Sequence, residues 1–321
     1  MNDFYLPVVP SIPGISLIGR GRRILKHVLG HHEVMTARDG DGWARCDLGH
    51  RHWGVYGAAG LLAVHHDPAD GPRVLMQKRA AWSHHGGTWG LPGGARDSHE
   101  DTIETALREA FEEAALDGTD LRVQGVYLDD HGGWSFETVI AEASELLRVV
   151  PASAESDDLR WVPTEEITAR ELHPGFAATW PVVGLALTPS LVVLDIANIV
   201  GARAEHGWWR DRAGAAARLL AEVGASAGDG RLTVPGRTPT LARWFPRLTA
   251  IVEGAARGVA SVPGVRVIAA PGSGDDAVVQ AVRDARPWEH VLVVTADRGL
   301  RERVTELGAE VTGPRWLLAQ L

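Results

Sequence analysis

Cysteine is almost absent from the 321-residue sequence, with Cys46 as its single representative. An internal disulfide is therefore excluded, which fits a reducing cytoplasm. The first ten residues, MNDFYLPVVP, lack the basic and apolar regions of a signal peptide. The longest apolar runs, near residues 57–64 and 191–200, are too short to cross a bilayer. We therefore expect a cytoplasmic protein with no membrane partner.

Lysine is missing from residues 190–321, which carry 16 Arg against 14 Asp and Glu, a net charge of +2. The net charge of the whole chain is −9, so the first 189 residues carry a net charge of −11. The negative charge of the whole chain argues against a protein that coats nucleic acid without specificity. The slight positive charge of residues 190–321 is compatible with an enzyme that acts on nucleic acid. An apolar content of 45% and this length indicate a globular chain of two domains.

The chain divides by pattern into an irregular N-terminal extension (1–51), a first domain (52–189) and a second domain (190–321), with the linker TPS at 188–190. In the first domain, apolar stretches bounded by turn residues predict several strands and a closing helix. The predicted strands are residues 54–64, 72–80, 121–130, 134–143 and 159–163, and the helix is 172–187.

In the second domain, apolar strands alternate with amphipathic helices. The predicted strands are residues 190–200, 248–254, 265–270 and 290–296, and the predicted helices are 211–224, 275–285 and 298–308. This alternation predicts an α/β fold with a parallel sheet flanked by helices.

The segment GGARDSHEDTIETALREAFEEAAL, residues 93–116, contains an unusual acidic helix. On a helix from Thr102 to Leu116, alanine and leucine form a buried stripe, and three glutamates fall on the opposite side within an arc of about 100°. They are Glu109, Glu112 and Glu113. Such acids repel one another unless a divalent cation such as Mg²⁺ binds them. A solvated helix face is the alternative for three glutamates taken alone.

The wider spacing resembles the Nudix hydrolase signature. Gly94 is followed after five residues by Glu100, after seven more by Arg108-Glu109, and then by Glu112-Glu113 and Leu116. The resemblance covers about residues 54–187 and implies an α/β/α sandwich with a mixed sheet. It also implies a metal-dependent hydrolase that cleaves a pyrophosphate bond in a nucleoside diphosphate linked to another group.

Carried onto this sequence, the resemblance makes Glu109, Glu112 and Glu113 ligands of Mg²⁺ or Mn²⁺, with the carbonyl of Gly94 as a further ligand. Arg108 would orient Glu109 and pair with Glu100. Glu109, Arg108 and Glu112 are the expected catalytic residues. The sequence departs from the family pattern at two positions of the helix, Ala115 in place of glycine and Ala110 in place of a larger aliphatic residue.

Four further residues are candidates for contact with a nucleotide. Arg79 matches a phosphate-contacting arginine of some Nudix hydrolases. Trp82, Trp89 and Trp134 lie near the expected pocket and could stack on a base; each is also a candidate core or rim aromatic.

Acidic residues in the second domain sit at the ends of apolar strands. Asp195 ends SLVVLD, Asp297 follows HVLVVTA, and Asp275-Asp276 opens a helix after GSG. Ligands of open parallel sheets bind beyond the carboxyl ends of the strands, so these acids should converge there. Helix capping is the alternative role for Asp275 and Asp297, whereas Asp195 caps no obvious helix.

As a set, LDIAN, GSGDDAVV and VVTADRGLRERV resemble the NYN branch of the PIN-like ribonucleases, over about residues 190–321. The resemblance implies that Asp195, Asp276 and Asp297 bind Mg²⁺ or Mn²⁺, that Asn198 is an accessory polar residue, and that RNA is a partner.

Cys46, His50 and His52, in CDLGHRHW, raise the question of a zinc site. One cysteine with two nearby histidines lacks the paired spacing of zinc motifs, so the sequence does not by itself predict one.

The function that these patterns favour is hydrolysis of a pyrophosphate bond in a nucleotide-type small molecule. Two alternatives stay open: a ribonuclease whose Nudix unit trims or recognises an RNA 5′ end, and a nucleotide-sensing protein without turnover. The intact glutamate set argues against the sensor. A homodimer is one of the assemblies that the sequence leaves open.

Overall fold

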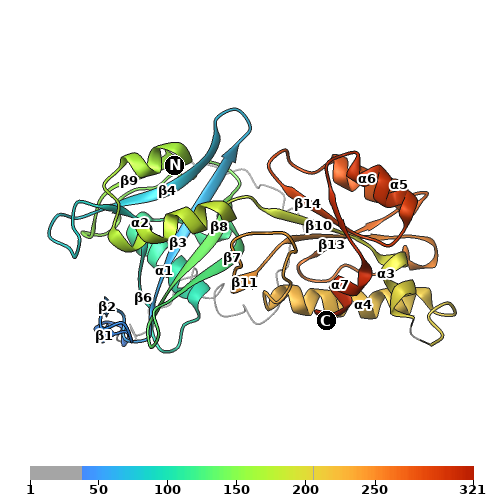
Figure 1. Cartoon of the computed structure of the whole chain (residues 1–321), viewed down its shortest axis with the longest axis horizontal. Helices are drawn as coiled ribbons and strands as arrows, with labels where there is room; N and C mark the ends of the chain where they lie inside the picture. Colours follow the sequence, from blue (N-terminus) through green and yellow to red (C-terminus); the bar gives the residue numbers. More distant parts are fainter. Residues whose placement is uncertain (1–37, 205) are drawn as a thin grey trace, which may run out of the picture. The chain divides into compact units, whose positions relative to one another are not determined.

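The computed structural model describes residues 38–204 and 206–321 (Figure 1). Residues 1–37 of the expected N-terminal extension, and Glu205, lie outside the described residues. The described part of the extension forms a hairpin of two antiparallel strands, β1 (Trp43–Arg45) and β2 (Arg51–Trp53).

Within the described residues, eight strands form a mixed sheet, as the sequence predicts for a Nudix fold. Its order is β11-β7-β8-β3-β4-β5, with β6 paired to β3 and β9 paired to β4; β3 and β8 run parallel, and the other neighbours are antiparallel. The strands are β3 (Ala58–Asp67), β4 (Gly71–Arg79), β5 (Trp89–Gly90), β6 (Gly93–Ala95), β7 (Leu121–Asp130), β8 (Ser135–Ala143), β9 (Ser156–Pro163) and β11 (Arg243–Trp244).

Two helices cover opposite faces of this sheet, α1 (Thr102–Ala114) and α2 (Pro174–Val183). Successive side chains of a strand point to opposite faces. Leu61 of β3 packs in one apolar cluster with the alanines of α1, whereas Leu62 packs in another with Phe176 of α2. The sheet is therefore the middle layer between the two helices.

A second sheet has five strands, all parallel, in the order β13-β12-β10-β14-β15. The parallel sheet predicted from the alternating pattern is confirmed. Its strands are β10 (Ser190–Asp195), β12 (Arg247–Val252), β13 (Val265–Ala269), β14 (His290–Val294) and β15 (Glu310–Thr312).

Helices pack on both faces of the second sheet, with α5 and α6 sharing a cluster with Leu191 and Val193, and α3, α4 and α7 sharing one with Val192 and Leu194. They are α3 (Ile196–Arg203), α4 (Arg212–Gly228), α5 (Gly274–Arg283), α6 (Arg298–Thr305) and α7 (Pro314–Leu318). Short 3₁₀ turns lie at Gly118–Asp120, Thr164–Ala169, Gly184–Ala186 and Gly254–Ala256. Among the described residues, no helix is long and apolar enough to cross a membrane.

Several predicted boundaries are wrong. The strand predicted over residues 190–200 stops at Asp195, and residues 196–203 are helical, because the Asp195 side chain accepts a hydrogen bond from the Asn198 N–H and caps α3. The strand predicted from residue 54 begins only at Ala58, since Gly54 and Gly57 adopt positive φ of 103° and 94°.

Two helix boundaries also differ. The helix predicted over 172–187 is shorter, because the His173 side chain caps its start and a 3₁₀ turn follows Val183. The helix predicted to end at Gly224 continues to Gly228; a Cβ at Gly224 would lie 3.2 Å from the Pro263 carbonyl oxygen, so this glycine serves close packing.

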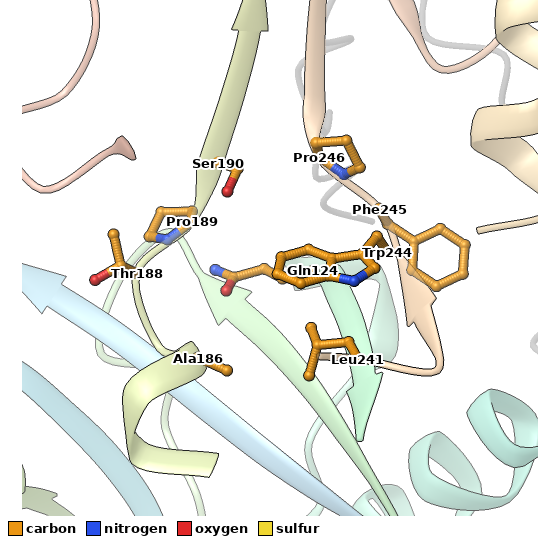
Figure 2. Close-up of a pocket in the computed structure, with 9 residues that line it drawn as sticks. All are labelled: Gln124, Ala186, Thr188, Pro189, Ser190, Leu241, Trp244, Phe245 and Pro246. Atoms are coloured by element: carbon orange, nitrogen blue, oxygen red, sulfur yellow. The ribbon is translucent and has the colours of Figure 1, made fainter. Parts of the chain in front are cut away.

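A short segment from the C-terminal part of the chain extends the first sheet. β11 pairs with the edge strand β7, the Ala242 N–H donates to Val126, and the Phe245 N–H donates to Gln124. Only Phe245 and Pro246 separate β11 from β12 of the second sheet. Figure 2 shows a small pocket beside this connection, where the Gln124 amide points toward residues 188–190.

The two sheets also share apolar contacts and an ion pair. One hydrophobic cluster contains Leu62 of β3 and Val192 of β10. Arg286 donates two hydrogen bonds, of 2.7 and 2.9 Å, to the buried carboxylate of Glu142 in β8. The two predicted domains, residues 52–189 and 190–321, therefore share part of their apolar core. The domain boundary between residues 189 and 190 stays a prediction.

Candidate active site

The helix α1 begins and ends at well-defined residues. Asp101 accepts hydrogen bonds from the N–H groups of Ile103 and Glu104, and the Glu104 side chain accepts from the Asp101 N–H, which makes a capping box. The helix ends at Ala114 and is followed by the C-cap residue Ala115, whose φ of 51° is left-handed. Glycine is the usual residue at such a position, so the family's glycine is replaced here by a residue that adopts the same conformation under strain.

The paired glycines before α1 allow the chain to approach the helix closely. A Cβ on Gly94 would lie 2.6 Å from Oε1 of Glu109, so this position has no room for a side chain. The Gly93 N–H donates to Oε2 of Glu113 at 2.8 Å. Strand β6 therefore places its backbone against two of the three predicted metal ligands.

Arg108 connects four groups of the site. Its guanidinium donates two hydrogen bonds to Glu100, of 2.6 and 2.9 Å, one to Glu109 at 2.6 Å and one to Glu112 at 3.2 Å. It also donates to the Ala95 carbonyl at 3.0 Å. Arg108 thus holds the carboxylates of Glu109 and Glu112 toward each other.

The alternative interpretation, a solvated helix face, is wrong for two of the three glutamates. Glu109 is 7% exposed and Glu113 is 4% exposed, because their arc of the helix is covered by residues 93–95, while Glu112 is only half-buried. Burial raises the pKa of Glu109 despite the neighbouring Arg108. Burial also raises the pKa of Glu113 to about 7.

These carboxylates suit a divalent cation. Charged groups buried without an adequate counter-charge are costly, and Arg108 is already shared with Glu100. Mg²⁺ and Mn²⁺ prefer carboxylate and carbonyl oxygens. Glu109, Glu112, Glu113 and the Gly94 carbonyl are the groups that could hold such an ion. In the structure, Arg38 from the segment before β1 forms an ion pair with Glu112.

Arg79 and Trp89 form contacts with residues other than the three glutamates. Arg79 ends β4, and its Nε donates to the His84 carbonyl at 3.0 Å in the loop that follows. Trp89 is 8% exposed and packs in the cluster that also holds Phe176. So little free surface does not support the expectation that Trp89 stacks on a base. Trp82 is 70% exposed on the loop after β4.

Trp134 lies in the turn between β7 and β8. Its indole N–H donates to the Gly54 carbonyl at 2.9 Å, and its ring stacks on His52 with centroids 4.0 Å apart. Both contacts are with the segment that precedes β3, so one face of this indole is already covered.

Asp195, Asn198 and Asp297 converge at the carboxyl edge of the second sheet. The Thr295 hydroxyl donates to Asp195 at 2.8 Å, and the Ala296 N–H donates to the Asn198 side chain at 2.8 Å. Asp297 accepts from the Leu300 N–H and caps α6. Asp195 caps α3, which corrects the expectation that it caps no helix, and burial raises its pKa.

Asp276 is directed elsewhere. It forms an ion pair with Arg303 at 2.6 Å and is exposed. Its neighbour Asp275 has a pKa raised by burial and then by the nearby charge of Asp297. The structure therefore brings Asp275, and not Asp276, toward the acids of the sheet edge.

Glu253 was missed by the sequence analysis. It directly follows β12, as Asp195 ends β10, and its carboxylate accepts from the Gly274 N–H at 2.8 Å. Its charge contributes to the raised pKa values of Asp195 and Asp275. The sequence contained the information needed to find Glu253, because an acidic residue at the end of an apolar strand is the pattern that identified Asp195.

Comparisons with known proteins cover the part of the chain that contains α1. The NUDIX domain model matches residues 58–181. A Mycobacterium tuberculosis protein named "Putative 8-oxo-dGTP diphosphatase 3" is 52% identical over 148 residues, which are 44% of this chain and 68% of that protein. A Bifidobacterium longum protein named "Nucleoside triphosphate pyrophosphatase/Nudix hydrolase fusion protein" is 44% identical over 146 residues, 44% of this chain and 30% of the relative.

Among solved structures, a Nudix hydrolase from M. smegmatis, RenU, is 47% identical and covers 44% of this chain and 91% of its own, with a TM-score of 0.42. The family model ends at residue 181, so the PIN-like assignment of residues 190–321 stays a prediction. The family model, together with 52% identity to a relative of which the chain spans more than two thirds, shows that this chain belongs to the Nudix family and is a hydrolase of pyrophosphate bonds.

Proposed function

We propose that the protein hydrolyses a nucleoside triphosphate to the monophosphate and pyrophosphate with the help of Mg²⁺ or Mn²⁺ held by Glu109, Glu112, Glu113 and the Gly94 carbonyl. The observation that carries the proposal is the burial of two carboxylates, Glu109 and Glu113, against the backbone of Gly93 and Gly94. Such a set of anions becomes favourable once a cation binds it.

When bound, the cation neutralises phosphate oxygens and lowers the pKa of water. The chain's residues supply the geometry. Arg108 fixes Glu109 and Glu112, and the Gly93 N–H fixes Glu113. Water forms a new bond to phosphorus, the bridging P–O bond breaks toward pyrophosphate, and a proton is released to solvent. Positioning and charge stabilisation account for most of the rate in such reactions.

The substrate class that we propose is an oxidised purine nucleoside triphosphate. The support is the 52% identity with the M. tuberculosis relative, whose name specifies 8-oxo-dGTP. Trp82, exposed after β4, offers an aromatic face for a base.

A substrate screen tests this proposal. The full chain with Mg²⁺ or Mn²⁺ is given 8-oxo-dGTP, the four ordinary dNTPs, ADP-ribose, a dinucleoside polyphosphate and a 5′-triphosphorylated RNA. Release of pyrophosphate from 8-oxo-dGTP with the highest kcat/KM supports the class. Preference for the RNA end would favour the RNA-trimming alternative, and binding without turnover of any compound would favour the sensor.

A second activity, divalent-metal-dependent cleavage of single-stranded RNA, is proposed for the second sheet. It is favoured by the convergence of Asp195, Asp275, Asp297 and Glu253 at the carboxyl edge of a parallel sheet. The pKa of Asp195 is raised by burial, so a cation there would offset the cost of keeping it charged.

Asp195→Asn separates a catalytic role from a structural one. Asparagine caps helices about as well as aspartate, so α3 should persist while the charge is lost. Mn²⁺-dependent cleavage of RNA by the full chain that disappears in Asp195→Asn supports the nuclease. Equal cleavage by both proteins, with no metal-dependent rise in Tm, would leave this edge as a capped scaffold.

A further inference from the structure

Four side chains with metal-binding atoms meet at a place that the pyrophosphatase function does not use. Cys46, His50, His52 and His131 each bring one ligand atom to within 4.8 Å of the others. The first three belong to the β1–β2 hairpin, and His131 comes from the turn between β7 and β8, about 80 residues further along the chain.

The register of the hairpin explains why three of the four share one face. Ala44 lies opposite His52, and the Cys46 N–H donates to the His50 carbonyl at 3.1 Å, which closes the hairpin. Residues directly opposite in an antiparallel pair project to the same side. His50 and His52 are two residues apart and therefore also share that side.

A backbone hydrogen bond fixes the turn between β7 and β8 against the β1–β2 hairpin. The Asp47 N–H donates to the Gly132 carbonyl at 2.8 Å, and a Cβ on Gly132, which has φ of 70°, would lie 2.7 Å from the Asp47 carboxylate. His131 next to this contact is thereby held close to Cys46.

Two ring nitrogens point to a missing ligand partner. Nε2 of His52 and Nδ1 of His131 are buried and have no hydrogen-bond partner among the described residues. The other nitrogen of His131, Nε2, lies 3.1 Å from the Asp129 carboxylate. A metal-binding histidine commonly donates its second N–H to a carboxylate in this way.

The β1–β2 hairpin is short and has little buried apolar surface of its own. Its strands have three residues each, and Trp43 and Trp53 are 45% and 44% exposed. An isolated two-stranded hairpin is at best marginally stable in water. Small units that lack an apolar core are commonly stabilised by disulfides or metals, and the single cysteine of this sequence allows no disulfide.

We propose that Cys46, His50, His52 and His131 bind one Zn²⁺ ion, which joins the β1–β2 hairpin to the β7–β8 turn. One thiolate and three imidazoles form a tetrahedral donor set that suits Zn²⁺ and not the oxygen-preferring Mg²⁺ or Mn²⁺. Ligand atoms of such a site are about 3.5 Å apart, which small side-chain rotations reach from the present spacing. The Cys46 thiol loses its proton on binding.

A zinc ion at this site would also hold the segment before β1, which contacts α1 and the loop between β6 and α1. In the same segment, Asp39 accepts two hydrogen bonds from Ser98, and Arg38 pairs with Glu112. Zinc at the hairpin would thus be a structural ion, at a site distinct from the three glutamates.

Cobalt substitution tests the proposal on the unmodified full chain. The protein is stripped with a chelator and titrated with Co²⁺ and then with Zn²⁺. We expect one equivalent of Co²⁺ to produce a sulfur-to-cobalt charge-transfer band and tetrahedral visible bands, both of which one equivalent of Zn²⁺ removes. Because Cys46 is the single cysteine, this band identifies its ligand without a mutation.

Variants then test the individual ligands. Cys46→Ser should abolish the charge-transfer band and lower Zn²⁺ affinity by about 100-fold or more, whereas Asp129→Asn should keep the band and lower affinity by about 10- to 100-fold. His206→Gln, an exposed histidine outside the cluster, is the matched control and should bind as wild type. Absence of the band in the wild-type protein, or unchanged Zn²⁺ affinity in both Cys46→Ser and Asp129→Asn, would overturn the site.

Discussion

Glu113→Gln is the substitution for which the structure predicts opposite effects with and without metal. Burial raises the pKa of Glu113 from about 4.5 to about 7, so the folded chain keeps its proton to a higher pH than the unfolded chain does. The resulting destabilisation grows as pH rises from about 4.5 to 7 and is complete above 7. The pKa difference corresponds to about 3 kcal/mol as an upper limit.

Glutamine carries no charge and can still accept the hydrogen bond from the Gly93 N–H. In the metal-free protein at pH 8, Glu113→Gln should therefore raise the free energy of unfolding by about 1–3 kcal/mol. At pH 4.5 the gain should largely vanish, because the wild-type carboxyl is then protonated in the fold. With Mg²⁺ or Mn²⁺ the order should reverse, since the variant loses a ligand, and turnover should fall by about 100-fold or more.

The free energy of unfolding is measured in urea at pH 8 and pH 4.5, once with EDTA and once with saturating Mn²⁺. Pyrophosphate release measures turnover. Glu145→Gln, at an exposed position, is the control for loss of one charge. A metal-free variant no more stable than this control at pH 8 would refute the argument that the buried carboxylate is costly. Wild-type turnover in the folded variant would refute its role as a metal ligand.

Three other substitutions give distinct results. Ala115→Gly should raise the unfolding free energy by about 1 kcal/mol in urea without changing kcat/KM, because glycine adopts the left-handed φ freely; lower stability would contradict the strain. Arg286→Ala should lower the unfolding free energy by about 3 kcal/mol, because it leaves Glu142 buried with weaker partners; a loss below about 0.5 kcal/mol would contradict this. Arg38→Ala should tighten Mn²⁺ binding by a few-fold in calorimetry, because Arg38 competes for Glu112; weaker binding would contradict that competition.

Five strands of the first sheet and its acidic helix were predictable because their pattern is local. The glycine pair, Arg108 and the glutamates lie within about 25 consecutive residues, so fixed spacing describes most of the site. The burial of Glu109 and Glu113 was not predictable in this way. It depends on Gly93 and Gly94 of strand β6 packing against one side of the helix.

Other features depend on contacts distant in the sequence. Asp275 and Asp276 are adjacent at the start of α5, where a step of one residue rotates the side chain by about 100°, so the sequence could not decide which one faces Asp195. His131 is separated from Cys46 by most of the first sheet, and no spacing rule connects them. The parallel direction of the strands in the second sheet followed from the alternation of strands and helices, whereas the end of β10 depended on a cap at Asp195.

The pairing of β11 with β7 has a consequence for synthesis on the ribosome. All the other strands of the first sheet end by Pro163, yet the edge of β7 gains its neighbour only after residues 243–244 have emerged. About 80 residues are therefore translated while an unpaired edge strand is available to other nascent chains. Unpaired edges of partly folded chains promote aggregation. Residues 242–245 thus act as a delayed cover for one edge of the sheet that carries the chemistry.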